Sequence, residues 1–167
     1  MSEKKFNILY VDDEPSNLRI FKMAFKRLYN IFTVNNVDEG IDILKNEEIH
    51  LIVTDQRMPH MTGVEFLAKI LPEYPDPVRM ILTGFSDVEA IIEAINSGRV
   101  YRYITKPWNK DELKTILDEA LDAWSKEQHK REQIKVLTEV NLQLEEKVKS
   151  LKSQLSQQSG MFAKADR

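Results

Sequence analysis

Polar residues that can do chemistry follow four short apolar runs of the sequence. A lysine directly after such a run is costly in a protein interior unless an anion lies beside it. The other runs supply anions or a hydroxyl at the equivalent point, immediately after their last apolar residue. In chain order, FNILYV, LIVT, VRMIL and VYRYIT are followed by Asp12-Asp13-Glu14, Asp55, Thr83-Gly84 and Lys106-Pro107.

The four runs are predicted to be buried strands, because they are rich in β-branched and aromatic residues and do not alternate strictly. They span 6–11, 51–54, 78–82 and 100–105, and a weaker run lies at 31–35. Apolar residues at steps of three and four predict helices between the strands and one more from about residue 110. Five strand–helix repeats predict an α/β fold with a parallel sheet that is covered on both faces.

In an open parallel sheet, the carboxyl ends of the strands meet at one edge. Three carboxylates, a hydroxyl and an ammonium are therefore expected to converge there, and the carboxylates would repel one another without a cation. The chain has no cysteine, and oxygen ligands of this kind favour Mg²⁺. Taken singly, Asp13 fits a helix cap, Thr83 a turn and Lys106 a solvent-reaching side chain. Their joint placement at one edge indicates a site instead.

Four stretches, ILYVDDEP, IVTDQRMPHMTGVEFL, ILTGFSD and YRYITKPW, resemble the receiver domain of two-component response regulators over about residues 4–125. The resemblance implies a five-stranded, doubly wound, flavodoxin-like receiver fold, an Mg²⁺ cofactor, and phosphorylation by a sensor histidine kinase or phosphotransfer protein. It implies Asp55 as phosphoacceptor, and Asp12, Asp13, Asp55 and the Arg57 carbonyl as metal ligands, with Asp13 favoured for direct contact. It also implies phosphate-binding and switch roles for Thr83, Lys106 and Tyr103, a cis peptide at Pro107, and rate tuning by Arg57 and Phe85.

The resemblance predicts a signalling switch that catalyses only its own phosphotransfer and dephosphorylation. The change would pass through the fourth helix, fifth strand and fifth helix. One alternative is an Mg²⁺-dependent phosphohydrolase of similar fold, but those enzymes carry a second aspartate where Arg57 stands. Another is an unphosphorylated scaffold, which the complete set of Asp55, Thr83 and Lys106 disfavours.

The composition changes after Trp124, because residues 125–152 contain no glycine or proline. We predict a receiver over 1–124, a coiled-coil extension over 125–155 that continues the last receiver helix, and a disordered end over 156–167. A heptad pattern predicts a homodimer through this coil, although Lys147 and Lys152 would face each other in a parallel pair; a solvated single helix is the alternative. The apolar seam and its asparagine comprise Ile134, Leu137, Asn141, Leu144, Val148, Leu151 and Leu155.

Charge and hydropathy argue against a nucleic-acid-binding protein and against a membrane-spanning protein. A formal net charge of -3 gives no general attraction to nucleic acid, and no apolar stretch reaches the ~18 residues of a membrane span. We expect a cytoplasmic protein without direct contact to DNA, RNA or membrane. The segment NLQLEEKVKSL resembles linkers that lead from receivers into cyclic-dinucleotide phosphodiesterase, cyclase, phosphatase or kinase modules. No such module is recognisable in the sequence, so either the chain is a fragment or the coil itself is the output.

Overall fold

The computed structural model, which describes residues 5–84 and 88–165, contains one parallel five-stranded sheet in the order β2-β1-β3-β4-β5. This confirms the predicted α/β fold. The strands lie within about two residues of the predicted runs. Their bounds are β1 Asn7–Val11, β2 Asn30–Val34, β3 Leu51–Asp55, β4 Val78–Thr83 and β5 Arg102–Thr105.

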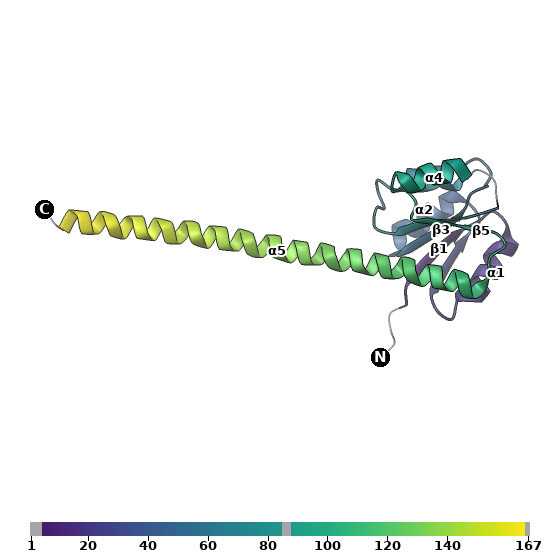
Figure 1. Cartoon of the computed structure of the whole chain (residues 1–167), viewed down its shortest axis with the longest axis horizontal. Coiled ribbons are helices and arrows are strands. Elements are labelled where there is room, and N and C mark those ends of the chain that lie inside the picture. The colour runs from purple at the N-terminus through teal and green to yellow at the C-terminus, as the bar shows by residue number, and fades with distance from the viewer. Residues whose placement is uncertain (1–4, 85–87, 166–167) are drawn as a thin grey trace. The chain divides into compact units, whose positions relative to one another are not determined.

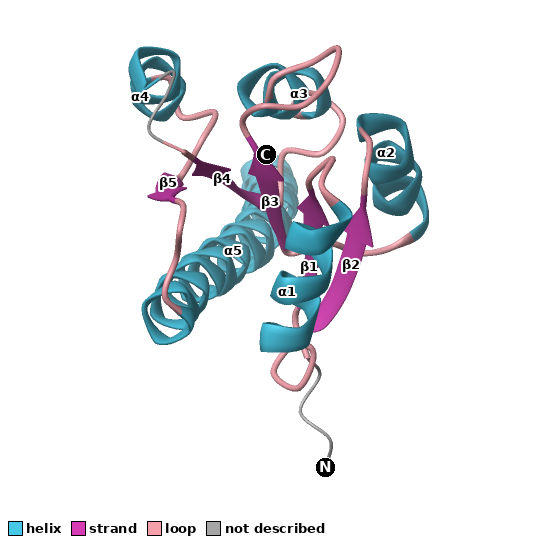
Figure 2. Cartoon of the chain, turned by 90° about the vertical axis from the view of Figure 1, so that its right-hand side faces the viewer, coloured by secondary structure: helices cyan, strands magenta, loops and turns pink. Residues whose placement is uncertain are grey.

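Helices cover both faces of the sheet, as Figure 2 shows. One face packs against α1 and the start of α5 through a core that includes Phe21, Phe25 and Leu117. The other packs against α2, α3 and α4 through Leu44, Phe66 and Ile91, among others. Both faces of the sheet are therefore dry, which explains why the strands do not alternate. The helices are α1 Pro15–Phe25, α2 Val37–Asn46, α3 Gly63–Ile70, α4 Val88–Asn96 and α5 Lys110–Ala165.

The helix starts are set by local chemistry. Pro15 occupies the first turn of α1, where its missing N–H costs nothing. Asn36 caps α2 by accepting a hydrogen bond from the N–H of Glu39. Thr62 and Glu65 form a reciprocal capping box at the start of α3. Each of these helix starts follows a loop at the carboxyl edge of the sheet.

The chain divides into two compact units, Met1–Ser125 and Lys126–Arg167, and α5 is one uninterrupted helix that belongs to both (Figure 1). The structure differs from the predicted disorder over 156–167, because it continues α5 to Ala165. No proline interrupts this stretch. Its one glycine, Gly160, costs a helix only about 1 kcal/mol relative to alanine. Among the described residues, no helix is both long and apolar enough to cross a membrane.

Candidate functional site

The anion that Lys106 requires is a pair of carboxylates at the carboxyl edge of the sheet. Its Nζ donates to Oδ2 of Asp12 at 2.8 Å and to Oδ1 of Asp55 at 2.7 Å. Asp12 directly follows β1, Asp55 is the last residue of β3, and Lys106 directly follows β5. The sheet order reverses direction around β1 and β3, which opens the crevice that such folds use for ligands.

Asp12 is 1% exposed and holds a dense set of hydrogen bonds. Besides Lys106, its donors are the hydroxyl of Tyr10 at 2.6 Å, the N–H of Glu14 at 2.9 Å and the amide of Asn17. Burial alone would raise the pKa of Asp12, but the bonds from Lys106 and Tyr10 outweigh burial and lower it. Asp12 is therefore a fixed anion of the site.

Tyr10 is itself buried, and burial together with its bond to Asp12 raises the pKa of its hydroxyl well above the usual range. The hydroxyl therefore stays protonated and remains a donor. Burial would lower the pKa of Lys106, but its bonds to Asp12 and Asp55 raise it. The ammonium is thus held in its charged form between two carboxylates.

Asp55 differs from Asp12 in its electrostatic balance. Burial raises the pKa of Asp55, the charge of Asp12 adds to that rise, and Lys106 only partly opposes it. Its Oδ2 accepts the N–H of Arg57 at 3.0 Å, while its Oδ1 takes Lys106. The carboxylate is thus oriented by two donors but lacks full charge compensation from the protein.

The acidic residues fit a divalent cation. Asp12, Asp13 and Asp55 each offer an oxygen, and the three oxygens lie within 4.8 Å of one another. An all-oxygen set that is partly open to water suits Mg²⁺, which keeps several waters and is usually held by one or two carboxylates. A cation there would supply the compensation that Asp55 lacks.

The loop after β3 depends on a close approach that sequence reasoning missed. A Cβ on Gly63 would lie 2.3 Å from the carbonyl oxygen of Asp55, closer than any real contact. The N–H of Gly63 donates to the carbonyl of Gln56, and the N–H of Val64 donates to the Gln56 side chain. These contacts fold residues 56–62 back over the end of β3. Glycine is therefore required where α3 begins.

The structure places the other predicted residues as follows. Thr83 is buried at the end of β4, and its hydroxyl donates to the carbonyl of Gly84. Tyr103 lies in β5 and packs against the core on the α4 side. The Lys106–Pro107 peptide is cis, the geometry that the resemblance implies. Phe85 lies outside the described residues. The Arg57 carbonyl as a metal ligand stays a prediction.

The sequence pattern of the response regulator receiver domain matches residues 8–118, which is most of the first compact unit. The chain belongs to this family. The chemotaxis protein CheY homolog of Campylobacter jejuni is 35% identical over 126 residues, covering 72% of this chain and 95% of that protein. The match therefore extends over nearly the whole of that relative.

Longer relatives share the receiver alone. The hydrogenase transcriptional regulatory protein HoxA of Bradyrhizobium diazoefficiens is 39% identical over 117 residues, covering 70% of this chain. The chain spans only about a quarter of the length of the HoxA proteins that it matches. The similarity to HoxA therefore concerns only part of that protein.

Solved structures give the same result for the fold. The signal receiver domain of an HD domain-containing protein from Pseudomonas fluorescens superposes with a TM-score of 0.71 at 30% identity, covering 77% of this chain and 96% of that one. A structure titled adenylate cyclase from Rhodopirellula baltica has a TM-score of 0.75 at 29% identity, covering 78% and 98%. Receivers of this form thus occur in proteins whose titles name different activities.

Proposed function

We propose that the chain is a phosphorylation-controlled switch whose acceptor is Asp55. The observation that carries this proposal is the bond of Lys106 to both Asp12 and Asp55 at the edge where three carboxylates gather. A histidine kinase or phosphotransfer protein is the expected donor, because the receiver family takes its phosphoryl group from such proteins. Regulation rather than turnover of an external substrate is therefore the expected role.

In the transfer, an oxygen of Asp55 forms a bond to phosphorus while the bond from phosphorus to the donor breaks, and its electron pair leaves with the donor group. Asp55 is suited to attack phosphorus because the N–H of Arg57 and the ammonium of Lys106 orient its carboxylate without fully compensating its charge. Lys106 then exchanges its contact with Asp55 for a contact with the phosphoryl oxygens, and keeps Asp12 as its second partner.

Mg²⁺ is the proposed cofactor, held by Asp13, Asp12 and Asp55 and, as the family implies, the Arg57 carbonyl. When bound, it supplies positive charge that stabilises the transferring phosphoryl group. Among the described residues, no protein group donates to Asp13, so its carboxylate is available as a direct ligand. Asp12 is already occupied by donors, which supports an indirect role for it.

The change is expected to travel through Thr83 and Tyr103 to the face formed by α4, β5 and the start of α5. An added phosphoryl group brings about one to two negative charges beside the buried hydroxyl of Thr83. Movement of Thr83 towards it would leave room for Tyr103, which is partly buried and packs against the core on the α4 side. This is a two-state element biased by a local charge.

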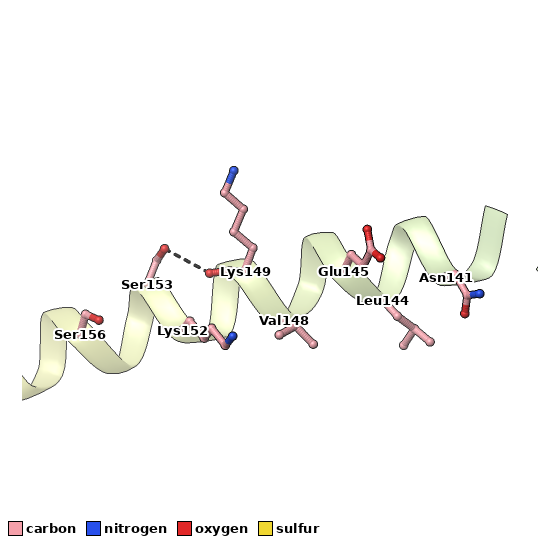
Figure 3. Close-up of a pocket in the computed structure, with 8 residues that line it drawn as sticks. All are labelled: Asn141, Leu144, Glu145, Val148, Lys149, Lys152, Ser153 and Ser156. Carbon is pink, nitrogen blue, oxygen red and sulfur yellow. Dashed lines mark hydrogen bonds between the residues drawn. The ribbon is translucent and has the colours of Figure 1, made fainter. Parts of the chain in front are cut away.

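We further propose that the tail, residues 125–155, forms a homodimeric coil. Its apolar seam is about half exposed in a single chain, from 48% at Val148 to 64% at Leu155. Figure 3 shows Asn141, Leu144 and Val148 on one side of the helix and Lys149 on the other. One seam position holds two β-branched residues, Ile134 and Val148, and the other holds only leucines, which favours a two-stranded coil. Asn141 would set the register if the two helices are parallel.

An output is expected to respond to this coil. The relatives carry names as different as a transcriptional regulatory protein and an adenylate cyclase, so receivers of this family serve several outputs. Because α5 is one helix from Lys110 to Ala165, we expect a shift at its start to pass along the helix without a flexible linker.

Chemical phosphorylation tests the proposal. With Mg²⁺ and acetyl phosphate, the chain should gain the mass of one phosphoryl group, and Asp55→Asn should gain none. Asp42→Asn, which changes an exposed aspartate on α2, should be labelled like the unchanged protein. A label that persists in Asp55→Asn would show that another residue is the acceptor.

A separate measurement tests which residues bind the metal. Asp13→Ala should weaken Mg²⁺ binding far more than Glu14→Ala, because Glu14 lies outside the acidic cluster. Calorimetric titration measures both affinities. Equal losses in the two variants would contradict the ligand assignment.

A further inference from the structure

The hydroxyl of Tyr10 is a buried polar group inside the site that the family resemblance does not explain. The Tyr10 side chain is 1% exposed and its ring packs 4.5 Å from that of Phe21 on the α1 side of the sheet. Its hydroxyl donates to Oδ2 of Asp12 at 2.6 Å. Residues two apart in a strand point to the same face, so β1 directs the tyrosine to this carboxylate.

The carboxylate of Asp12 has more donors than a typical metal ligand. Oδ2 accepts from Tyr10, Lys106 and Asn17, and Oδ1 accepts from Asn17 and from the N–H of Glu14. An ionised carboxylate has about four lone-pair sites, so these contacts already use its acceptor capacity. Direct binding of a cation by Asp12 would require the loss of at least one of them. Contact through a water molecule would not.

Tyr10 and Lys106 share the same oxygen. A carboxylate oxygen with two strong donors divides its charge between them, so each bond is weaker than it would be alone. Lys106 must leave Asp55 when the phosphoryl group arrives, and it turns about its remaining contact with Asp12.

We propose that Tyr10 is a positioning residue of the phosphorylation site: its hydroxyl keeps Asp12 from binding the metal directly and frees Lys106 to move to the phosphoryl group. The inference rests on the proposed function, since it assigns Tyr10 to the same site. A tyrosine that only fills the core would use its ring alone, and phenylalanine would serve as well. The two roles differ in what the hydroxyl does to the cations around Asp12.

The test compares Tyr10→Phe with a matched control, Tyr29→Phe. The hydroxyl of Tyr29 also donates to an aspartate, Oδ1 of Asp118 at 2.5 Å, far along the chain from the acidic cluster. Both changes keep the ring and remove one tyrosine–aspartate hydrogen bond. Chemical denaturation establishes whether both variants remain folded, and calorimetric titration measures their affinity for Mg²⁺.

We expect Tyr10→Phe to bind Mg²⁺ about three- to tenfold more tightly than the unchanged protein, because a buried carboxylate that loses a donor attracts cations more strongly. At saturating Mg²⁺, labelling of Asp55 by acetyl phosphate should slow by about the same factor, since Lys106 is held by Asp12. Tyr29→Phe should match the unchanged protein in both measurements. A general loss of stability would not raise metal affinity.

Unchanged or weaker Mg²⁺ binding by folded Tyr10→Phe would overturn the inference. If Tyr10→Phe does not fold, Asn17→Ala provides a second test, because it removes the amide that donates to both oxygens of Asp12. This variant should also bind Mg²⁺ more tightly. Unchanged Mg²⁺ binding by Asn17→Ala would equally overturn the inference. Failure of the unchanged protein to bind Mg²⁺ or to be labelled at Asp55 would instead overturn the proposed function.

Discussion

Helix α5 presents the same kind of apolar stripe to two different surroundings. In the compact unit that ends at Ser125, Leu113, Leu117 and Leu121 of α5 are at most 2% exposed, because the sheet covers them. In the unit that begins at Lys126, Ile134, Leu144 and Leu151 are 49–54% exposed in the single chain. A stripe of this size is rarely left in water. Equal periodicity therefore predicts a buried face in both units, and among the described residues only the stripe of the first unit is covered in the single chain.

The polar residues of the two units show the same contrast. Lys106 bonds two buried carboxylates that lie 51 and 94 residues away in sequence. In the tail, Arg131 pairs with Glu127 one turn earlier on the same exposed helix. Exposed pairs of this kind contribute little, about 0.3–0.5 kcal/mol. The described contacts of the receiver's site are therefore long-range within one chain, whereas this ion pair of the tail is local to a single helix.

The largest effect is expected from substitutions that disrupt the proposed dimer seam of the tail. Replacing Leu144 and Leu151 by serine should abolish dimers, because each buried leucine truncated in this way costs about 2–5 kcal/mol per chain. The receiver should keep its unfolding temperature, since neither leucine belongs to its core. Light scattering gives the mass in solution, and calorimetry gives the unfolding temperature.

Gln143→Ser with Lys149→Ser is the matched control, because both residues lie off the seam of the same helical stretch. This pair of changes should leave the mass in solution unchanged. A leucine variant that remains dimeric would mean that the receivers associate by themselves and that the tail has another partner.

A smaller effect concerns the receiver alone. Gly63→Ala should destabilise it by about 1–3 kcal/mol, because the new methyl group would meet the Asp55 backbone and the loop must shift. The same shift should reduce labelling of Asp55. Gly40→Ala is the control, since a Cβ there makes only ordinary contacts at 3.4–3.6 Å with neighbouring side chains. Urea denaturation and the labelling assay would detect the difference, and equal behaviour of the two variants would refute it.

The sequence was enough to predict the edge at which the site lies. Asp12, Asp55 and Lys106 each follow an apolar run, and parallel strands bring such positions together whatever the loops between them do. The five strands were predictable for the same reason, because apolar runs between helical periods allow few other topologies. The family resemblance then assigned individual roles.

The contacts that sequence reasoning missed depend on where the backbone passes. Gly63 is needed because the start of α3 approaches the end of β3, a distance that no spacing in the sequence reveals. Tyr10 belongs to a run that the sequence marks only as apolar, although its position two before Asp12 lets its side chain point to the same side as that carboxylate. The polarity of the residues beyond Leu155 predicts disorder, but a helix can continue there because the stretch contains no proline and a single glycine.

The pH dependence of stability in Asp55→Asn and in the unchanged protein tests how fully Lys106 compensates the charge of Asp55. Burial, with the charge of Asp12 adding to it, raises the folded-state pKa of Asp55 above the usual 3.8. A raised pKa means that the ionised form destabilises the fold, fully above the folded-state pKa and progressively less as the pH falls towards 3.8. Without Mg²⁺, Asp55→Asn should therefore be more stable than the unchanged protein at pH 7, on the order of 1 kcal/mol.

The difference should close as the pH is lowered through the folded-state pKa, which urea denaturation at several pH values in the presence of a chelator would follow. Asp42→Asn, at an exposed aspartate paired only with Lys45 three residues on, should show no such gain at pH 7. Lower stability of Asp55→Asn at pH 7 would mean that Lys106 compensates the carboxylate completely, so that the receiver needs no cation for balance.

The smallest expected effect comes from a second glycine-to-alanine substitution, which should stabilise the protein, whereas Gly63→Ala should destabilise it. Gly160 lies beyond the tail, in the last turns of α5 and on the side of the helix away from the seam, and a Cβ there would meet nothing within 4 Å. Gly160→Ala should therefore stabilise the end of the helix by about 0.5–1 kcal/mol, because alanine loses less backbone entropy than glycine in a helix. Hydrogen exchange over residues 156–165 should slow, while the receiver and the mass in solution stay unchanged. Faster exchange after the substitution would imply that this stretch packs against another surface in solution, and the end of the helix would then resemble the receiver in requiring a specific close approach.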